Sequence, residues 1–288
     1  MTIHTFKSFV TTTLTPLFPA TEIETFFFLL MEELLGMQRI DTVLKASEEI
    51  STDKLVALKE ALKRLEEEEP IQYILGTTEF YGLPFIVTPD TLIPRPETEE
   101  LVTWVLESLS PTENTTILDI GTGSGCIPIA LKKKAKNTIV SAIDVSKEAL
   151  VIAEKNALKN ETNIQFHQAD ILATSSLSFT NTEKFDVIVS NPPYVRELEK
   201  AEISNNVLQN EPHLALFVSN ENPLLFYSKI AELAAKHLTE NGLLFFEINQ
   251  YLGNETAAML AEKGFSDIEL RKDIFKNDRM LKAVWKKG

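Results

Sequence analysis

The stretch Leu118-Asp119-Ile120-Gly121-Thr122-Gly123-Ser124-Gly125 joins an apolar run to a helical pattern through a loop rich in glycine. Residues 116–120 predict a buried strand, and residues 125–135 predict a helix that begins where the loop ends. Because glycine has no Cβ, this loop lets the backbone approach a ligand closely, with the helix N-terminus directly behind it. A strand, a glycine loop and a helix in this order indicate the first unit of a doubly wound α/β sheet.

The chain beyond residue 97 continues this alternation of short apolar runs and amphipathic stretches. Alternating strands and helices predict a mostly parallel sheet with helices on both faces, here a doubly wound, seven-stranded Rossmann-like sheet. The predicted strands are residues 116–120, 138–143, 163–168, 185–190, 242–248, 266–270 and 280–285. The predicted helices are residues 97–108, 125–135, 146–160, 223–238 and 253–263.

The spacing of the glycines indicates the kind of ligand. A dinucleotide fingerprint has the pattern Gly-x-Gly-x-x-Gly, but here the third glycine comes one position early and Cys126 stands in its expected place. Asp144 closes the second predicted strand, where a carboxylate suits the two hydroxyls of an unphosphorylated ribose. A short glycine loop with a ribose acid and no phosphate ligand suits S-adenosylmethionine. Asp170, after the third strand, fits equally well as a partner of the adenine amino group and as a helix cap.

A second chemical pattern, Asn191-Pro192-Pro193-Tyr194, follows the apolar run of residues 185–190. It stands at the carboxyl end of a predicted strand, the edge at which open α/β sheets bind ligands. The two prolines stiffen the turn, because proline fixes its own φ and restricts the residue before it. The Asn191 side-chain oxygen and the Pro192 carbonyl then offer two fixed acceptors to a planar NH2 group, beside which Tyr194 can stack. A stiff loop with a capping asparagine is the structural alternative.

The N-terminal quarter of the chain has a different pattern. Residues 1–69 predict a small helical bundle without a catalytic pattern of its own, in which Thr21-Glu22-Ile23-Glu24 fits a capping box and Gly36 a helix end. Residues 70–96 contain two short strand patterns around a Gly/Pro turn. The chain is therefore predicted to consist of the bundle (1–69), a β-hairpin linker forming one wall of the site (70–96) and the α/β domain (97–288).

Composition limits the classes of function. The chain has 288 residues, of which 44% are hydrophobic and 24% charged, as in soluble globular proteins of about two domains. A net charge of -14 argues against broad, sequence-independent DNA binding. The single cysteine fits a reducing compartment, and the four histidines lack metal-ligand spacing. Without a signal peptide pattern or a membrane span, we expect a cytoplasmic monomer that uses no metal and does not associate with membranes.

Further motifs extend these patterns along the chain. The motifs Gln72-Tyr73-Ile74-x-Gly76, Glu79-Phe80-Tyr81-Gly82, Leu92-Ile93-Pro94-Arg95-Pro96-Glu97-Thr98-Glu99 and Glu211-Pro212-x-x-Ala215-Leu216 accompany the glycine loop and the Asn-Pro-Pro-Tyr turn. Together they resemble the HemK-type release factor glutamine methyltransferases, which are class I S-adenosylmethionine-dependent enzymes. The resemblance runs from about Pro70 to the C-terminus, whereas the bundle matches only in size and helical character.

The resemblance implies methyl transfer from S-adenosylmethionine to the side-chain nitrogen, N5, of the glutamine in the Gly-Gly-Gln loop of peptide chain release factors. The donor would leave as S-adenosylhomocysteine, and no general base is predicted. The expected catalytic residues are Asn191, Pro192 and Tyr194. The expected cofactor-binding residues are Gly121, Thr122, Gly123, Ser124, Gly125, Asp144, Asp170, Ile171 and Asn191. The expected substrate-binding residues are Asn191, Pro192, Pro193, Tyr194, Arg95 and Pro96.

Two other functions share parts of this pattern. A DNA adenine N6-methyltransferase uses the same tetrapeptide on a flipped base, but it needs a basic recognition region that this acidic chain lacks. A non-catalytic adenosylmethionine-binding adaptor predicts a degraded acceptor motif, whereas residues 191–194 are intact. Two positions depart from the family pattern, because Asn249 and Lys276 replace its usual glycines. We expect these departures to affect local backbone geometry and not the chemistry.

Overall fold

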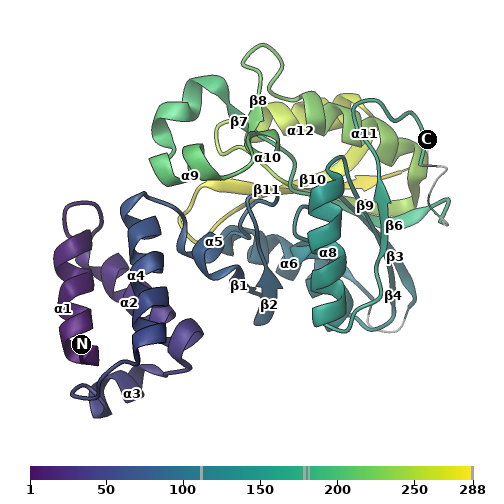
Figure 1. Ribbon diagram of the computed structural model, residues 1–288. Helices are drawn as coiled ribbons and strands as arrows, with labels where there is room; N and C mark the ends of the chain where they lie inside the picture. Colours follow the sequence, from purple (N-terminus) through teal and green to yellow (C-terminus); the bar gives the residue numbers. More distant parts are fainter. Residues whose placement is uncertain (111–112, 178–179, 181, 287–288) are drawn as a thin grey trace. The chain divides into compact units, whose positions relative to one another are not determined.

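The computed structural model describes residues 1–110, 113–177, 180 and 182–286, which divide into two compact units (Figure 1). The first unit comprises Met1–Gly76 with Ser204–Asn210, and the second comprises Thr77–Ile203 with Glu211–Gly288. Residues 111–112, 178–179, 181 and 287–288, which belong to the predicted α/β domain, lie outside the described residues.

The first unit is helical, as the sequence predicts. Its core gathers apolar residues spaced three or four apart, so that each long helix buries one face. Gly36 ends the second helix in the left-handed conformation (φ 69°), and its N–H bonds to the carbonyls of Met31 and Glu32. The helices are α1 (Ile3–Leu14), α2 (Ala20–Leu35), α3 (Arg39–Leu44), α4 (Thr52–Glu66), α5 (Ile71–Leu75) and α9 (Asn205–Asn210).

The capping box predicted at residues 21–24 is wrong. Helix α2 begins at Ala20, directly after Pro19, so Thr21 lies inside the first turn and caps nothing. The pattern has the right spacing, but Pro19 takes the extended N-cap position and leaves Ala20 as the first helical residue. A side-chain cap of the expected kind is found instead at Thr2, whose hydroxyl accepts from the N–H of Thr5 at the start of α1.

The second unit contains the predicted sheet. Among the described residues seven strands pair in the order β10-β11-β9-β6-β3-β4-β5, of which β5, β4, β3, β6 and β9 are mutually parallel. Strand β11 runs antiparallel to both its neighbours. The prediction of seven strands is confirmed; their bounds are β3 (Thr115–Ile120), β4 (Thr138–Asp144), β5 (Gln165–Gln168), β6 (Phe185–Ser190), β9 (Leu238–Glu247), β10 (Phe265–Lys272) and β11 (Asp278–Trp285).

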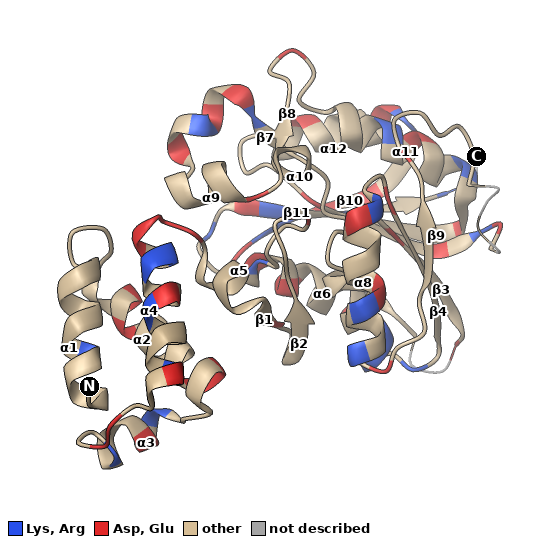
Figure 2. Cartoon of the chain, in the orientation of Figure 1, with Lys and Arg blue, Asp and Glu red and all other residues tan. Residues whose placement is uncertain are grey.

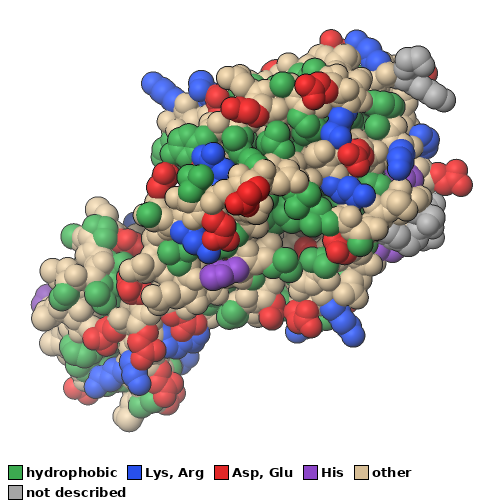
Figure 3. Space-filling view, turned by 90° about the horizontal axis from the view of Figure 1, so that it is seen from above, with side chains coloured by type: hydrophobic (Ala, Val, Ile, Leu, Met, Phe, Trp, Pro, Cys, Tyr) green, Lys and Arg blue, Asp and Glu red, His purple; other side chains and the backbone are tan. Residues whose placement is uncertain are grey.

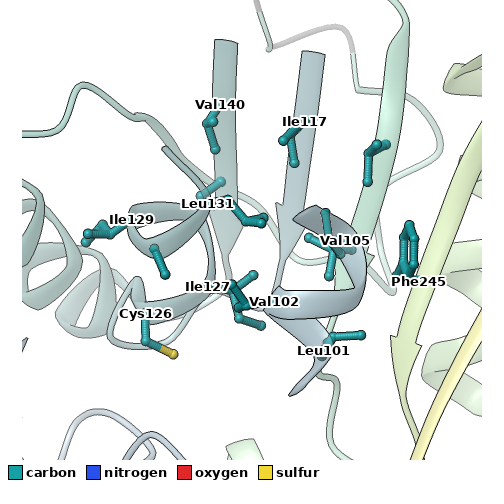
Figure 4. Close-up of a cluster of buried hydrophobic side chains, with 14 of the residues drawn as sticks. Leu101, Val102, Val105, Ile117, Cys126, Ile127, Ile129, Leu131, Val140 and Phe245 are labelled. Carbon is teal, nitrogen blue, oxygen red and sulfur yellow. The ribbon is translucent and has the colours of Figure 1, made fainter. Parts of the chain in front are cut away.

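Helices cover both faces of this sheet. Helices α6 (Pro96–Ser108), α7 (Cys126–Lys134) and α8 (Lys147–Lys159) lie on one face, and α11 (Leu225–His237) and α12 (Gly253–Glu262) on the other. In Figure 4, Val105 of α6 and Leu131 of α7 lie in the same cluster as Ile117 and Val140 of the strands. Because both faces are covered, successive strand residues such as Ile117 and Leu118 are both fully buried.

The predicted hairpin packs on the first of these faces. Strands β1 (Thr77–Phe80) and β2 (Leu83–Ile86) pair in antiparallel fashion, and Phe80 and Phe85 enter the core formed by α6 and α7. Asn156 of α8 fastens this hairpin, since its side chain accepts from the Ile86 N–H at 2.6 Å and donates to the Ile86 carbonyl at 2.9 Å. The sequence did not indicate that the residues just before the hairpin form the short helix α5.

A segment between β6 and α11 adds short elements that the sequence did not predict. Strand β7 (Val195–Arg196) pairs in parallel with β8 (Phe217–Val218), and a 3₁₀ helix η1 (Glu197–Glu202) and α10 (His213–Leu216) lie between them in sequence. Two-residue strands show no periodicity, so only their long-range pairing defines them. Figure 3 looks onto this side of the second unit, where hydrophobic side chains alternate with charged ones. No described helix has the length and apolar character needed to cross a membrane.

Candidate active site

A cavity of about 500 Å³ opens at the carboxyl edge of the parallel strands, within the size range of small-molecule sites. Strand β3 is the point at which the strand order reverses, and ligands bind outside such points in open α/β sheets. The predicted residues that line the cavity are Arg95, Gly121, Thr122, Gly123, Ser124, Asp144, Asp170, Ile171, Asn191, Pro192 and Pro193. Three predicted residues, Pro96, Gly125 and Tyr194, do not line it.

The glycine loop forms the floor of the cavity beyond β3. Gly121 and Gly123 have φ values of 75° and 53°, which side chains with a Cβ rarely adopt. A Cβ built on either glycine has no neighbour within 4 Å, so the missing side chains keep the cavity open. Gly125 has a different role, because a Cβ there would lie 3.1 Å from Ala153 and Ile129. It lets α7 pack closely against α8.

Asp144 joins the loop to the next strand. Its Oδ2 accepts from the Gly123 N–H at 2.8 Å, and its Oδ1 accepts from the Ser146 N–H at 2.9 Å. Burial raises the pKa of this carboxyl, while the two backbone donors act in the opposite direction. Each carboxylate oxygen keeps acceptor capacity for a further donor. Asp144 therefore orders the loop and can still accept from ribose hydroxyls.

Asp119, two residues before Gly121, is a further candidate that no predicted site included. Both of its carboxylate oxygens are fully buried and have no hydrogen-bond partner in the described part of the chain. Burial raises the pKa of Asp119 to about 7. An unpaired carboxyl group in this position suits a ligand that carries positive charge. The only signal in the sequence was an acidic residue inside an otherwise apolar strand.

Asp170 and Ile171 follow β5 at the far side of the cavity. Asp170 is exposed, and its Oδ1 accepts from the Leu172 N–H at 2.8 Å. Its carbonyl also accepts from the N–H and hydroxyl of Thr174. Residues 171–173 form a turn and not a helix, so the predicted helix cap is wrong, and Asp170 lines the cavity. The predicted contact of Asp170 with the adenine amino group stays a prediction.

The Asn191-Pro192-Pro193-Tyr194 turn lies at the end of β6, against the same cavity. Asn191 Nδ2 donates to Thr98 Oγ1 at 3.3 Å. No donor in the described residues binds Asn191 Oδ1 or the Pro192 carbonyl, so both acceptors are available. The Tyr194 hydroxyl donates to Glu247 Oε1 at 3.1 Å, and this side chain lines a neighbouring cavity of about 50 Å³. The predicted stacking role of Tyr194 remains a prediction.

The residues before α6 form a further wall. Arg95 pairs with the buried Glu211 at 2.6 Å, and the Ile93 N–H donates to the second oxygen of Glu211 at 3.2 Å. These contacts join the 92–99 motif to the Glu-Pro motif at residue 211. Pro96 is the first residue of α6, where its missing N–H costs no helical hydrogen bond.

These features fit S-adenosylmethionine. The glycine loop lets the ligand lie close to the backbone, and Asp144 can accept from the ribose hydroxyls. The unpaired carboxyl of Asp119 can interact with a positively charged group of the ligand. Among the described residues no group of three or more His, Cys, Asp or Glu side chains could hold a metal ion.

Comparisons with known families match both units. Residues 101–214 match the family model described as methyltransferase small domain. Residues 22–76 match the PrmC N-terminal domain. The second match covers most of the helical unit, whose residues 1–69 contain none of the family motifs given above.

Curated relatives match nearly the whole chain. A release factor glutamine methyltransferase of Flavobacterium psychrophilum is 50% identical, covering 98% of this chain and 99% of its own. A release factor glutamine methyltransferase of Bacteroides thetaiotaomicron is 41% identical, and the match covers 96% of this chain and 98% of that protein. A solved methyltransferase of Pyrococcus furiosus is similar in fold, with a TM-score of 0.54 at 18% identity, covering 82% of this chain and 100% of that one.

Proposed function

Because the chain belongs to the family of release factor glutamine methyltransferases, we propose that it transfers a methyl group from S-adenosylmethionine to a glutamine side chain of a peptide chain release factor. The observation that carries the proposal is the position of the Asn191 and Pro192 acceptors on the same cavity as the glycine loop and Asp144. The methyl donor and the glutamine amide that receives the methyl group would therefore meet in one cavity.

The residues of the turn act by positioning a poor nucleophile. An amide nitrogen reacts slowly because its lone pair is delocalised into the carbonyl. Asn191 Oδ1 and the Pro192 carbonyl can each accept one hydrogen of the glutamine NH2 group, which fixes the nitrogen in place. S-adenosylmethionine, when bound, supplies an electrophilic methyl group on a positively charged sulfur. Transfer forms the C–N bond, breaks the S–C bond and releases one amide proton to water.

The finer identity of the substrate is part of the same proposal. We infer that the acceptor is the glutamine of the Gly-Gly-Gln loop, and that the chain works as a cytoplasmic monomer without a metal. A stiff turn with two neighbouring acceptors suits a side chain presented on an extended loop. Arg95 and Pro193 line the same cavity, and we expect them to contact the residues that flank the glutamine.

The helical unit is proposed to bind the body of the release factor, with residues 1–69 as the docking part and 70–96 as the linker. Its core is separate from those of the α/β unit and it carries no catalytic pattern. On helix α3, the side chains of Ile40, Val43 and Leu44 have exposed fractions of 58%, 70% and 75%. Apolar side chains exposed together on one short helix suit contact with another protein.

DNA adenine methylation is not favoured. In the view of Figure 2, basic residues are interspersed with acidic ones along the helices, and the chain carries a net charge of -14. Phosphate-directed binding rests on groups of Lys and Arg that neutralise the backbone. The matched relatives are named for release factors.

One assay tests the proposal. Donor labelled in its methyl group is offered to intact release factor, to the same factor with the loop glutamine replaced by alanine, and to duplex DNA. We expect label only in the first sample. Label in the alanine variant at the wild-type level would place the methyl group elsewhere, and label in DNA would favour the base-modifying alternative.

A further inference from the structure

A buried chain of hydrogen bonds lies behind the Asn-Pro-Pro-Tyr turn. Glu247, the last residue of β9, is 1% exposed. Its Oε2 accepts from Thr98 Oγ1 at 2.7 Å, and its Oε1 accepts from the Tyr194 hydroxyl at 3.1 Å. Thr98 in turn accepts from Asn191 Nδ2 at 3.3 Å. One carboxylate thus connects to both ends of the turn.

The direction of these bonds follows from the number of protons. A threonine hydroxyl has one proton to donate, and a carboxylate can only accept. Once Thr98 donates to Glu247, its oxygen can only accept, so Asn191 must present its NH2 group to it. The Asn191 oxygen is then turned toward the cavity. If the amide were flipped, two oxygens would face each other and the cavity would meet a donor in place of an acceptor.

This direction requires the carboxylate form of Glu247, which burial disfavours and the neighbouring donors favour. Burial raises the pKa of Glu247, and the charge of Glu97 adds to that effect. The Thr98 hydroxyl, the Arg279 guanidinium and the Tyr194 hydroxyl act in the opposite direction by stabilising the carboxylate. Arg279 Nη1 also donates to the Tyr194 oxygen at 3.4 Å, which leaves the Tyr194 proton for Glu247. The carboxylate is therefore supplied with donors on both of its oxygens.

We propose that Glu247 is a positioning residue that acts through Thr98 to hold the Asn191 amide with its oxygen toward the substrate nitrogen. This inference rests on the proposed function, because it assigns the Asn191 oxygen to the glutamine NH2 group. Neither Glu247 nor Thr98 needs to contact the substrate for this role. Their effect is to preorganise an acceptor that would otherwise have two orientations of similar energy.

The test compares Thr98→Val, which keeps the shape and removes the hydroxyl, with Thr98→Ser, which keeps the hydroxyl. A third variant, Glu247→Gln, keeps the size of the side chain and allows it to donate toward Thr98. Thr256→Val is the matched control, since Thr256 is equally buried, donates to the Leu252 carbonyl and lies on α12. For each variant we would measure kcat and KM with a release factor substrate, donor affinity by calorimetry and Tm.

We expect Thr98→Val and Glu247→Gln to lower kcat by about 10- to 100-fold, as misplacement of a reacting group does. Donor affinity should stay within about threefold, because the donor side of the cavity is unchanged. Thr98→Ser should recover most of the rate that Thr98→Val loses, and Thr256→Val should keep the wild-type kcat. Equal losses in the valine and serine variants, or a Thr98→Val enzyme with wild-type kcat, would overturn the inference.

A second measurement separates this inference from the proposed function. In protein labelled with ¹⁵N-asparagine, the side-chain NH2 signal of Asn191 reports its hydrogen bond to Thr98 without any substrate, and Asn191→Ala assigns that signal. We expect slow hydrogen exchange in the wild type and in Thr98→Ser, and fast exchange in Thr98→Val. If the wild type holds this bond but methylates no release factor, the proposed substrate is wrong and the amide orientation stands. If exchange is the same in all variants, the positioning role is wrong.

Discussion

Asp119→Asn should stabilise the protein in the absence of the methyl donor and weaken binding of that donor. The substitution keeps the shape of the side chain and removes a carboxyl group that has no partner in the described structure. Burial raises the pKa of Asp119 from an ordinary 3.8 to about 7 in the folded protein. Between these two values the folded state binds more protons than the unfolded state, so stability falls as pH rises through this window.

The magnitude follows from the separation of the two pKa values. At pH 8 the ionisation of Asp119 lowers the free energy of unfolding by about 4 kcal/mol, and at pH 5 by about 2 kcal/mol. Asparagine does not ionise, so Asp119→Asn should gain most at pH 8. For a unit of this size the Tm should rise by roughly 5–15 °C. Thermal unfolding at pH 5 and pH 8, without donor, measures both numbers.

Donor binding should change in the opposite direction. Hydrogen bonds to a charged group contribute about 1.5–3 kcal/mol, so affinity should fall by roughly 10- to 100-fold. Asp186→Asn is the control, because Asp186 already accepts from the Thr116 N–H at 2.8 Å and from Thr239 Oγ1 at 3.1 Å. It should lower Tm slightly and leave donor affinity unchanged. A lower Tm for Asp119→Asn at pH 8, or unchanged donor affinity, would refute the reasoning.

Three further predictions concern the acceptor, the donor and the docking unit. Asn191→Ala should lower kcat by about 10²-fold or more while calorimetry shows donor affinity within about threefold, and turnover above about a tenth of wild type would contradict the assignment. Asp144→Ala should weaken donor affinity by roughly 10- to 100-fold with a smaller effect on kcat at saturating donor, whereas a loss of Tm alone would mean that the acid serves only to order the loop. The double variant Val43→Ser/Leu44→Ser, at exposed positions of α3, should raise KM for intact release factor by about fivefold or more. The KM for a Gly-Gly-Gln peptide should stay unchanged. Equal effects on both substrates would exclude docking through this helix.

Periodicity predicted the sheet because its central strands β3 and β6 are buried on both faces and therefore read as nearly continuous apolar runs. The elements between β6 and α11 were missed for a different reason. Strands β7 and β8 are two residues long and are defined by pairing between positions that are more than 20 residues apart. Local patterns carry no information about such pairing. The helix start at Ala20 was missed for a local reason, because Pro19 takes the N-cap position in place of the well-spaced side-chain pattern.

The site was predictable where a residue acts through its own chemistry. The glycine loop, Asp144 and residues 191–193 lie together on one cavity, as their places at strand ends indicated. Thr98 was visible in the sequence only as a member of the 92–99 motif, and Asp119 and Glu247 only as acids within predicted strands. Their roles depend on contacts between segments as far apart as 149 residues, as in the bond from Thr98 to Glu247. Such contacts appear only once the chain is folded.

The position of Lys276 shows how the chain does without one of the two glycines of the family pattern. Lys276 adopts the left-handed conformation, with φ at 69°, which costs a residue with a Cβ roughly 1 kcal/mol. Asp273 holds the turn in this shape, since its side chain accepts from the N–H groups of Phe275 and Asn277 and from Arg279 Nε. The glycine geometry is therefore retained under strain.

Asn249 is a different case, because its φ is not positive and a glycine is not required there. Its Nδ2 donates to the Tyr194 carbonyl at 2.9 Å and to Glu199 Oε2 at 2.8 Å, so the replacement adds bonds that glycine cannot make. Arg279, beyond the strained turn, bonds to the hydroxyl of the same tyrosine. Asn249 thus contacts Tyr194 directly, whereas the turn at Lys276 precedes a residue that does, and neither Asn249 nor Lys276 lines the larger cavity with the glycine loop and Asp144. Substitution at these two positions can alter how firmly the acceptor turn is held while leaving the donor cavity as it is.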